Sequence, residues 1–404
     1  MTFVAISTIV NGVKKGLPIH YVFMPSNTER FHFLDGLRGI ASLLIVIHHT
    51  FTTHIVAFLD QHGWSVPGFL LLTFTQSGVE LFFVLSGVVL LRPYLRSGRR
   101  LDVKNFYYRR FRRIYPPYAA ALVFGAAVVW VILAFPTWYS EELLPFSFRE
   151  LVEQAFIFNF DGVYFNIAWW SLQIEILFYI LVPVIIHRFA AARRFSYRRL
   201  WLLITLTLLL TTCAQVYLDA THPHIYSYHA TRLIFYKFID YPICFLLGVY
   251  LAASDSNPKE AVLFILAGIL LIAASWFFLP FGYAGCGLVY AGMIVLMFQE
   301  NRLKRLFERP LFVWLGERSF SLFLTHVSVI HLLNFAVSNF LPGRNLLYGA
   351  VTRLLMFPVC LFAAMLLFQF VERRYARGLQ TANRFWPWSG RKKEKPDQAA
   401  VTGF

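Results

Sequence analysis

The sequence predicts an all-α membrane protein, a polytopic bundle of about ten transmembrane helices with both termini in the cytoplasm. Three observations predict this class. Hydrophobic residues make up 58% of the 404 residues and charged residues only 14%, against about 25% in soluble domains. Apolar runs long enough to cross a bilayer recur along the chain, and the mean hydropathy is +0.58. Basic residues gather in alternate loops, as topology determinants do.

Ten segments of about twenty residues are expected to span the membrane. They are residues 36–57, 68–91, 115–135, 167–188, 200–218, 232–252, 261–280, 282–299, 311–336 and 348–370. Gly, Pro, Ser and charged residues interrupt several of them. Helices in the interior of a membrane bundle tolerate such residues, so these segments are kept as spans.

The spans divide the chain into three regions. Residues 1–32 are expected to form a cytoplasmic N-terminal segment, 33–372 an integral membrane domain, and 373–404 a basic, disordered cytoplasmic tail. The N-terminal apolar run is short and precedes its charges, which is the wrong order for a signal peptide. The longest outer loop, 137–166, is too short for a soluble second domain.

The distribution of basic residues sets the orientation. The loops 92–113, 188–199 and 300–310 and the tail are basic, and all fall on one side of a ten-span arrangement. The opposite loops are neutral or acidic. By the positive-inside rule the basic side is cytoplasmic. Topology therefore accounts for the net charge of +16, which is not interpreted as a nucleic-acid-binding surface.

No metal site or disulfide framework is predicted. Cysteines occur at Cys213, Cys244, Cys286 and Cys360, all within apolar segments and without CxxC or zinc-type spacing. His222, His224 and His229 cluster in one outer loop, but no carboxylate or cysteine completes a ligand set. Phosphate-loop, GxSxG, HExxH and EF-hand patterns do not occur.

The first span carries Arg38, His48 and His49 on an otherwise apolar helix. An ionisable group inside a bilayer costs roughly 2.5–3.5 kcal/mol on insertion scales, so its default interpretation is a functional site. On an α-helix Arg38 and His49 share one face and lie about 16 Å apart along the axis. His48 points about 100° away from His49 and is expected to be structural. The alternative is that Arg38 snorkels to the interface and His49 is a packing residue.

The second span contains a carboxylate and a notch of small residues. Glu80 could form an ion pair with Arg38, which would lower the insertion cost of both. Ser86 and Gly87 leave room for a ligand or for another helix. Close helix packing is the alternative interpretation, because small residues favour it in membranes.

Four arginines interleaved with aromatic residues precede the third span, in NFYYRRFRRIYPPY. Arg110 and Arg113 lie three residues apart, so on a helix they share a face and could grip one anion. The phosphate groups of a cytoplasmic cofactor would fit such a clamp. The alternative is a topology-setting loop that binds lipid phosphates.

The fourth and ninth spans add further polar groups. Ser171 and Glu175 share a helical face just after Trp170, where a carboxylate could orient a sugar hydroxyl or assist proton transfer. A structural ion pair and an interfacial tryptophan belt are the alternatives. His326 in the ninth span is expected to be a hydrogen-bonded structural residue.

Five segments in order resemble the acyltransferase 3 family of integral membrane acyltransferases. They are FLDGLRGIASLLIVIHH, GVELFFVLSGVVLLRPYL, FYYRRFRRIYPPY, WWSLQIEILFYIL and LGERSFSLFLTH. The resemblance implies transfer of an acyl group, usually acetyl from cytoplasmic acetyl-CoA, to a hydroxyl of an envelope carbohydrate, free or lipid-linked. Membrane lipids are the other expected partners. Neither a metal nor nucleic acid is implied, and the oligomeric state is left open.

The resemblance also implies roles for individual residues. The family's functional Arg and His of the first span match Arg38 and His49. Its RxxR pattern matches Arg110 and Arg113, its Ser-Gly matches Ser86 and Gly87, and its carboxylate after WSL matches Glu175. His49 is then expected to be the general base, and Arg38 to hold a CoA phosphate or the thioester oxyanion. Glu80, Trp170 and Ser171 complete the predicted site.

The chain departs from the family pattern at three places. Val88 follows the Ser-Gly where Phe is common, Glu317-Arg318 replaces an apolar pair, and Glu372 is followed by Arg373 and Arg374 instead of an x-Pro pair. These departures leave the acceptor and subfamily open. Succinyl transfer and a flippase or transporter of an acylated or lipid-linked saccharide are the rival functions. A transporter has no use for a CoA-binding arginine pair.

Overall fold

The computed structural model describes residues 31–96, 100–135, 148–157, 166–191, 197–221, 240–254, 257–278, 280–340 and 346–375. Within these ranges every regular element is a helix. Residues 1–30 of the predicted N-terminal segment, most of the predicted tail, and the outer-loop residues His222, His224 and His229 lie outside the described residues.

The helices follow one another along the chain with the following bounds. They are α2 (His32–Ile47), η1 (His48–Thr52), α3 (Thr53–Gln61), α4 (Ser65–Gln76), α5 (Gly78–Leu95), α6 (Val103–Ala134), α8 (Phe148–Ala155), η2 (Ile167–Trp169), α9 (Trp170–Ala191), α10 (Tyr197–Thr221), α12 (Pro242–Ala253), α13 (Pro258–Ala274), α14 (Pro280–Met297), α15 (Arg302–Phe307), α16 (Pro310–Phe340), α17 (Leu346–Leu367) and η4 (Phe368–Glu372). Both η1 and η4 are π-helical turns, and η2 is a 3₁₀ turn.

Five of the described helices are long and apolar enough to cross a membrane. A sixth span results if α2 with η1 and the following α3, which are bent by 50° relative to each other, count as one. The remaining predicted segments coincide with α10, α12, α13 and α14, of which α12 and α14 are shorter apolar helices. The all-helical, multi-span class is thus supported, whereas the count of ten and the cytoplasmic termini stay predictions.

The helix that contains the third predicted span begins earlier than the predicted start of that span. Helix α6 starts at Val103, twelve residues before the expected position 115, because the Asp102 side chain accepts a hydrogen bond from the backbone N–H of Asn105 at 3.1 Å. This N-cap satisfies a backbone donor that the helix itself cannot pair. Arg109, Arg110, Arg112 and Arg113 of the predicted basic loop therefore lie on this helix, and their side chains have fixed directions.

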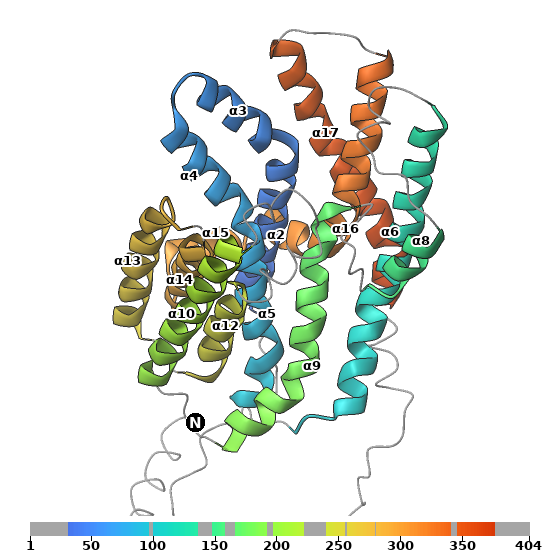
Figure 1. The fold of residues 1–404 in the computed structure, drawn as a ribbon. Coiled ribbons are helices and arrows are strands. Elements are labelled where there is room, and N and C mark those ends of the chain that lie inside the picture. Colours follow the sequence, from blue (N-terminus) through green and yellow to red (C-terminus); the bar gives the residue numbers. More distant parts are fainter. Residues whose placement is uncertain are drawn as a thin grey trace, which may run out of the picture. The chain divides into compact units, whose positions relative to one another are not determined.

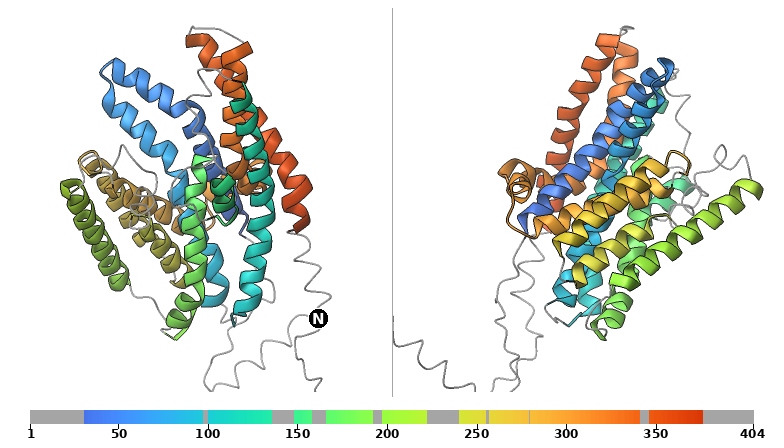
Figure 2. Two further views of the ribbon diagram at one scale, coloured as in Figure 1. Left: turned by 45° about the vertical axis from the view of Figure 1, so that its right-hand side comes forward. Right: turned by 90° about the vertical axis from the view of Figure 1, so that its left-hand side faces the viewer.

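The helices pack in three groups, which Figures 1 and 2 show. Helices α10, α12, α13 and α14 lie on one side, and α6, α16 and α17 on the other. Between them run α2, α5 and α9; α5 contacts both α12 and α9, and α2 contacts both α5 and α16. The central helices are therefore the ones that can carry groups facing either side.

Glycines allow α2 and α16 to cross at backbone contact. A Cβ on Gly316 would lie 1.8 Å from the carbonyl oxygen of Asp35, and a Cβ on Gly39 would lie 2.8 Å from that of Phe312. No side chain fits at either position. Two of the sequence motifs, DGLRG and LGERS, are thus the two faces of one helix crossing, which sets the position of Arg38.

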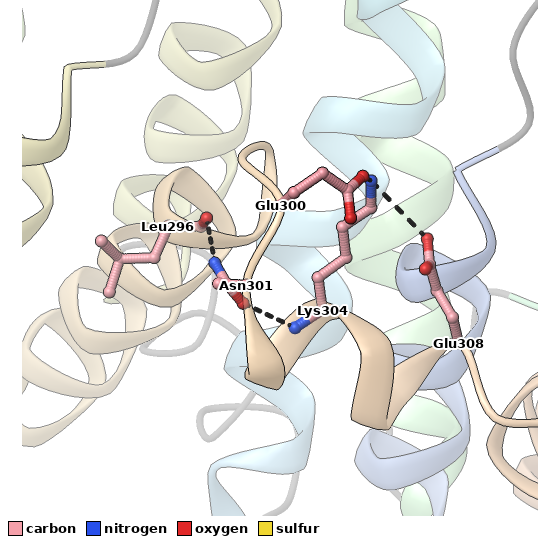
Figure 3. Close-up of polar contacts among 5 residues, drawn as sticks. All are labelled: Leu296, Glu300, Asn301, Lys304 and Glu308. Carbon is pink, nitrogen blue, oxygen red and sulfur yellow. Dashed lines mark hydrogen bonds and ion pairs between the residues drawn. The ribbon is translucent and has the colours of Figure 1, made fainter.

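Polar contacts involve both ends of α15 (Figure 3). The Asn301 side chain caps α15 by accepting from the backbone N–H of Lys304 at 2.7 Å, and it donates to the carbonyl of Leu296 at 2.5 Å. The Lys304 ammonium lies between the carboxylates of Glu300 and Glu308, as Figure 3 shows. The end of α15 packs directly on α2, where a Cβ on Gly36 would lie 2.0 Å from the carbonyl oxygen of Phe307.

Candidate active site

A cavity of about 560 Å³, measured with the open space at its mouth, lies among α2, α5, α6, α9 and α16. The described residues that line it are Arg38, Val79, Phe82, Phe83, Arg113, Ile114, Ser171, Glu175, Tyr179, Phe320 and Phe323. A second cavity of about 320 Å³ is lined by Arg38, Phe82, Leu85, Ser86, Val89, Leu90, Arg110, Arg113, Glu175 and Tyr179. Because five lining residues are common to both, we treat them as one space, the arginine cavity.

Cations dominate the arginine cavity. Its described lining carries the guanidinium groups of Arg38, Arg110 and Arg113 against the single carboxylate of Glu175. Among the described residues, neither a hydrogen bond nor an ion pair reaches Arg38 or Arg113, and the buried Nε of Arg110 has no hydrogen-bond partner. The Arg110 guanidinium lies 5.7 Å from the ring centroid of Tyr179. Such a cluster is suited to an anionic ligand, which would supply the missing acceptors.

Two hydroxyl groups hold the carboxylate of Glu175 in place. The Ser86 hydroxyl donates to Glu175 Oε1 at 3.2 Å, and the Tyr179 hydroxyl donates to the same oxygen. The donors come from α5 and from the next turn of α9. The carboxylate is therefore fixed at the boundary between the two parts of the cavity, within electrostatic range of Arg38.

The structure brings six predicted site residues together. Arg38, Arg113 and Glu175 line both parts of the arginine cavity, Arg110 and Ser86 line the smaller part, and Ser171 lines the larger. They come from four helices, and the expected common face of Arg110 and Arg113 is the one turned toward the cavity. The roles assigned to these residues remain predictions.

Three other predicted site residues lie on a different side of the bundle. Glu80 and Gly87 are seven residues apart on α5 and share a face about 100° from the cavity-lining face. A Cβ on Gly87 would lie 2.7 Å from Gly248 Cα of α12, so this glycine serves a close helix crossing. The Trp170 ring lies 5.2 Å from that of Tyr241, beside α12.

The expected ion pair between Glu80 and Arg38 is wrong. Glu80 is 2% exposed and lies within electrostatic range of Cys244, Cys286 and Tyr290 on α12 and α14. Arg38 lines the arginine cavity, which lies against a different face of α5, and none of the described ion pairs joins the two residues. Sequence spacing could not have settled this, because the pairing depends on which faces of two separate helices meet.

Three histidines form a second cluster outside the arginine cavity. The His49 ring centroid lies 5.2 Å from that of His326 on α16 and 5.0 Å from that of His48. The His48 Nδ1 lies 3.3 Å from the Thr75 hydroxyl. None of the three histidines lines either part of the cavity, but Phe323, which does, lies with its ring 6.3 Å from His326. We call this group the histidine cluster.

His48 was expected to point away from His49, and this is wrong. The chain leaves the α-helix at Ile47 and forms the π-helical turn η1 from His48 to Thr52. In a π-helix hydrogen bonds run from i to i+5, so successive residues advance less around the axis than in an α-helix. The two rings pack edge to face. Such turns occur often at functional sites.

Tyr179 and Phe323 are among the lining residues that the sequence interpretation did not name. Tyr179 carries a hydroxyl in the middle of an apolar span and lies four positions after Glu175, a spacing that predicts contact on a helix. Phe323 separates the cavity from His326 and has no signal in the sequence that distinguishes it from other core phenylalanines. Among the described residues, no group of three or more His, Cys, Asp or Glu side chains could hold a metal ion.

Residues 31–372 match the model of a family described as an acyltransferase domain. This match covers most of the chain, which therefore belongs to the acyltransferase 3 family.

Two relatives of this chain carry names that describe peptidoglycan O-acetyltransferases. The chain is similar to "Peptidoglycan O-acetyltransferase OatA" of Listeria monocytogenes, with 23% identity over 87% of this chain and 58% of the relative. It is also 26% identical to "Putative peptidoglycan O-acetyltransferase YrhL" of Bacillus subtilis, over 74% of this chain and 48% of the relative. The chain thus spans about half the length of these relatives. No solved structure matches it.

Proposed function

We propose that this protein is a membrane O-acyltransferase that moves an acetyl group from cytoplasmic acetyl-CoA to a hydroxyl of a cell-envelope polysaccharide, in the bacterial inner membrane. The observation that carries the proposal is the arginine cavity, in which three guanidinium groups face one carboxylate inside a membrane-spanning bundle. Unbalanced cations are costly in a bilayer unless an anionic ligand accompanies them. Membership of the acyltransferase family supports an acyl-CoA as that ligand.

The arginines would hold the donor. Arg110 and Arg113 grip phosphate groups of CoA, because planar guanidinium groups form paired hydrogen bonds with phosphate oxygens. Arg38 holds a further negative group, either a phosphate or the oxyanion that develops on the thioester carbonyl. Ser86 and Glu175 line the path of the acyl group between these cations.

The transfer itself needs a base for the acceptor. The acceptor oxygen attacks the acetyl carbon and gives its proton to the imidazole of His49, the carbon–sulfur bond breaks, and CoA leaves as the thiolate, which takes up a proton. A neutral imidazole suits this task because its unperturbed pKa lies near the working pH. Direct transfer and transfer through a covalent enzyme intermediate both fit this arrangement.

The acceptor to test first is peptidoglycan, since two relatives carry that word in their names. The experiment supplies labelled acetyl-CoA to inverted membrane vesicles that contain the protein and glycan fragments. We expect label on the glycan with the wild type. We expect little with the double variant Arg110→Gln/Arg113→Gln and normal labelling with Arg109→Gln, a control on the same helix that lines neither part of the cavity.

Two results would contradict the proposal. One is the absence of label from every glycan, lipid-linked saccharides included. The other is undiminished labelling by the double variant at equal protein abundance, since a saccharide transporter would not depend on these arginines. Labelled succinyl-CoA in a parallel reaction distinguishes succinyl transfer from acetyl transfer.

A further inference from the structure

In the buried imidazole of His326, one nitrogen forms hydrogen bonds and the other forms none with the described residues. Its side chain is 0% exposed, and its Nδ1 lies 2.9 Å from the carbonyl oxygen of Phe323 and 3.1 Å from that of Leu322. A carbonyl can only accept, so Nδ1 carries the proton. The Nε2 of the neutral ring is then an acceptor, and it has no hydrogen-bond partner among the described residues.

The position of His49 matches the partner that this nitrogen lacks. The ring centroids of His49 and His326 are 5.2 Å apart. A linear N–H···N hydrogen bond of about 2.9 Å places two imidazole centroids about 5.2 Å apart. The present rings are tilted by 45°, so reorientation of the His49 side chain, without movement of the helices, would make the bond.

Other side chains border the two rings. His48 packs edge to face against His49, with its own Nδ1 at 3.3 Å from the Thr75 hydroxyl. That hydroxyl donates to the Leu71 carbonyl at 2.9 Å, so His48 is the donor toward it. The thiol of Cys360 on α17 lies 3.8 Å from the carbonyl oxygen of His326. Two imidazoles on η1 and one thiol on α17 are thus the titratable groups that lie beside His326 in the described part of the chain.

We propose that His326 is a positioning residue for His49 and that its Nε2 accepts a hydrogen bond from a ring N–H of His49. This inference rests on the proposed function, in which His49 is the base. The bond makes the opposite nitrogen of His49 the unprotonated one and directs it toward the acceptor hydroxyl. After His49 has taken up the proton, the same bond stabilises the imidazolium. A carboxylate does this for the histidine of a serine hydrolase triad, and here a neutral imidazole does it.

Two variants separate positioning from mere packing. His326→Leu fills the space without an acceptor, and His326→Gln retains an amide oxygen that can accept from His49. We expect His326→Leu to lower kcat by about 10- to 100-fold, as loss of a partner that orients a histidine does. The KM for acetyl-CoA should stay unchanged, because His326 lines neither part of the arginine cavity. His326→Gln should recover much of the kcat, and His331→Leu on the same helix is the control.

A second measurement does not depend on activity. Nitrogen-15 NMR of labelled histidine in proteoliposomes reports the tautomer of His49, which is assigned by the signal lost in His49→Gln. We expect one tautomer in the wild type and in His326→Gln, and a mixture in His326→Leu.

Three outcomes would overturn the inference. They are an unchanged kcat in His326→Leu, a loss in His326→Gln as large as in His326→Leu at equal abundance, and the same His49 tautomer in the wild type and in His326→Leu. A wild-type protein that transfers no acetyl group contradicts the proposed function instead, and the NMR measurement still judges the bond between the two histidines.

Discussion

The arginine cavity and the histidine cluster are built on the same helices but differ in chemistry. Both use the first helical segment and α16: Arg38 and Phe320 face the cavity, whereas His49 and His326 face each other. The cavity carries permanent charges, hydroxyl groups and open space. The histidine cluster is closely packed and contains only groups that can be neutral. The difference indicates a division of labour, in which one region would bind an anionic donor and the other would handle protons.

Removing the imidazole of His49, the proposed base, should have the largest effect. It tests most directly whether the histidine cluster handles protons. His49→Ala is expected to lower kcat by about 10²- to 10⁴-fold, the usual contribution of a general base, with the KM for acetyl-CoA unchanged. The measurement is acetyl transfer from labelled acetyl-CoA in vesicles. His62→Ala, at an exposed position at the end of α3, is the control. Wild-type acetylation by His49→Ala at equal abundance would show that the cluster has no part in proton transfer.

Weakening the arginines that are proposed to bind acetyl-CoA should raise the KM and leave kcat largely unchanged. Arg113→Gln is expected to raise the KM for acetyl-CoA by about 10- to 100-fold, because a hydrogen bond to a charged group contributes about 1.5–3 kcal/mol. Arg113→Lys keeps the charge but not the planar geometry, and it should fall in between. A loss confined to kcat, with the KM unaltered, would mean that Arg113 acts on the reacting atoms and that the two regions are not separate.

The shared helix crossing should affect both regions at once. Gly316→Ala places a Cβ 1.8 Å from the Asp35 carbonyl oxygen, so α2 and α16 must separate. We expect the free energy of unfolding to fall by about 1–3 kcal/mol, as overpacking does, together with a loss of activity. Thermal denaturation in detergent measures the first effect. Gly68→Ala is the control, since its nearest atom would be 3.5 Å away; equal stability of the two variants would contradict this crossing.

The smallest effect is expected at the rim of the cation cluster. Glu372 in η4 is buried, accepts from the Ser321 hydroxyl at 2.6 Å, and lies within electrostatic range of Arg113 and Arg38. Glu372→Gln keeps an acceptor for Ser321 but removes the negative charge. The KM for acetyl-CoA should change by only about two- to threefold, because Glu372 lines neither part of the cavity. A change as large as that of Arg113→Gln would place Glu372 in the donor site itself.

Local spacing explains which site residues could be predicted. Arg110 and Arg113 share a face because they are three residues apart on one helix, and Glu175 and Ser171 do so because they are four apart. The shared face of two residues depends only on their spacing within one helix, so it can be predicted even where the ends of that helix are predicted wrongly. Helix α6 begins twelve residues before the expected position, and the shared face of Arg110 and Arg113 is unaffected. The error at His48 arose where this regularity fails, in the π-helical turn.

The sequence by itself determined the class of the protein, the approximate place of most helices, and the polar groups that a membrane bundle must accommodate. Apolar length and helical periodicity are properties of one segment at a time. Only the tertiary structure decided that Ser86 faces Glu175 while Glu80 turns toward α12, and that His326 lies against His49. These pairings join helices far apart in the chain. They depend on where backbones can approach, as at Gly316, and on a local change of helix type in η1.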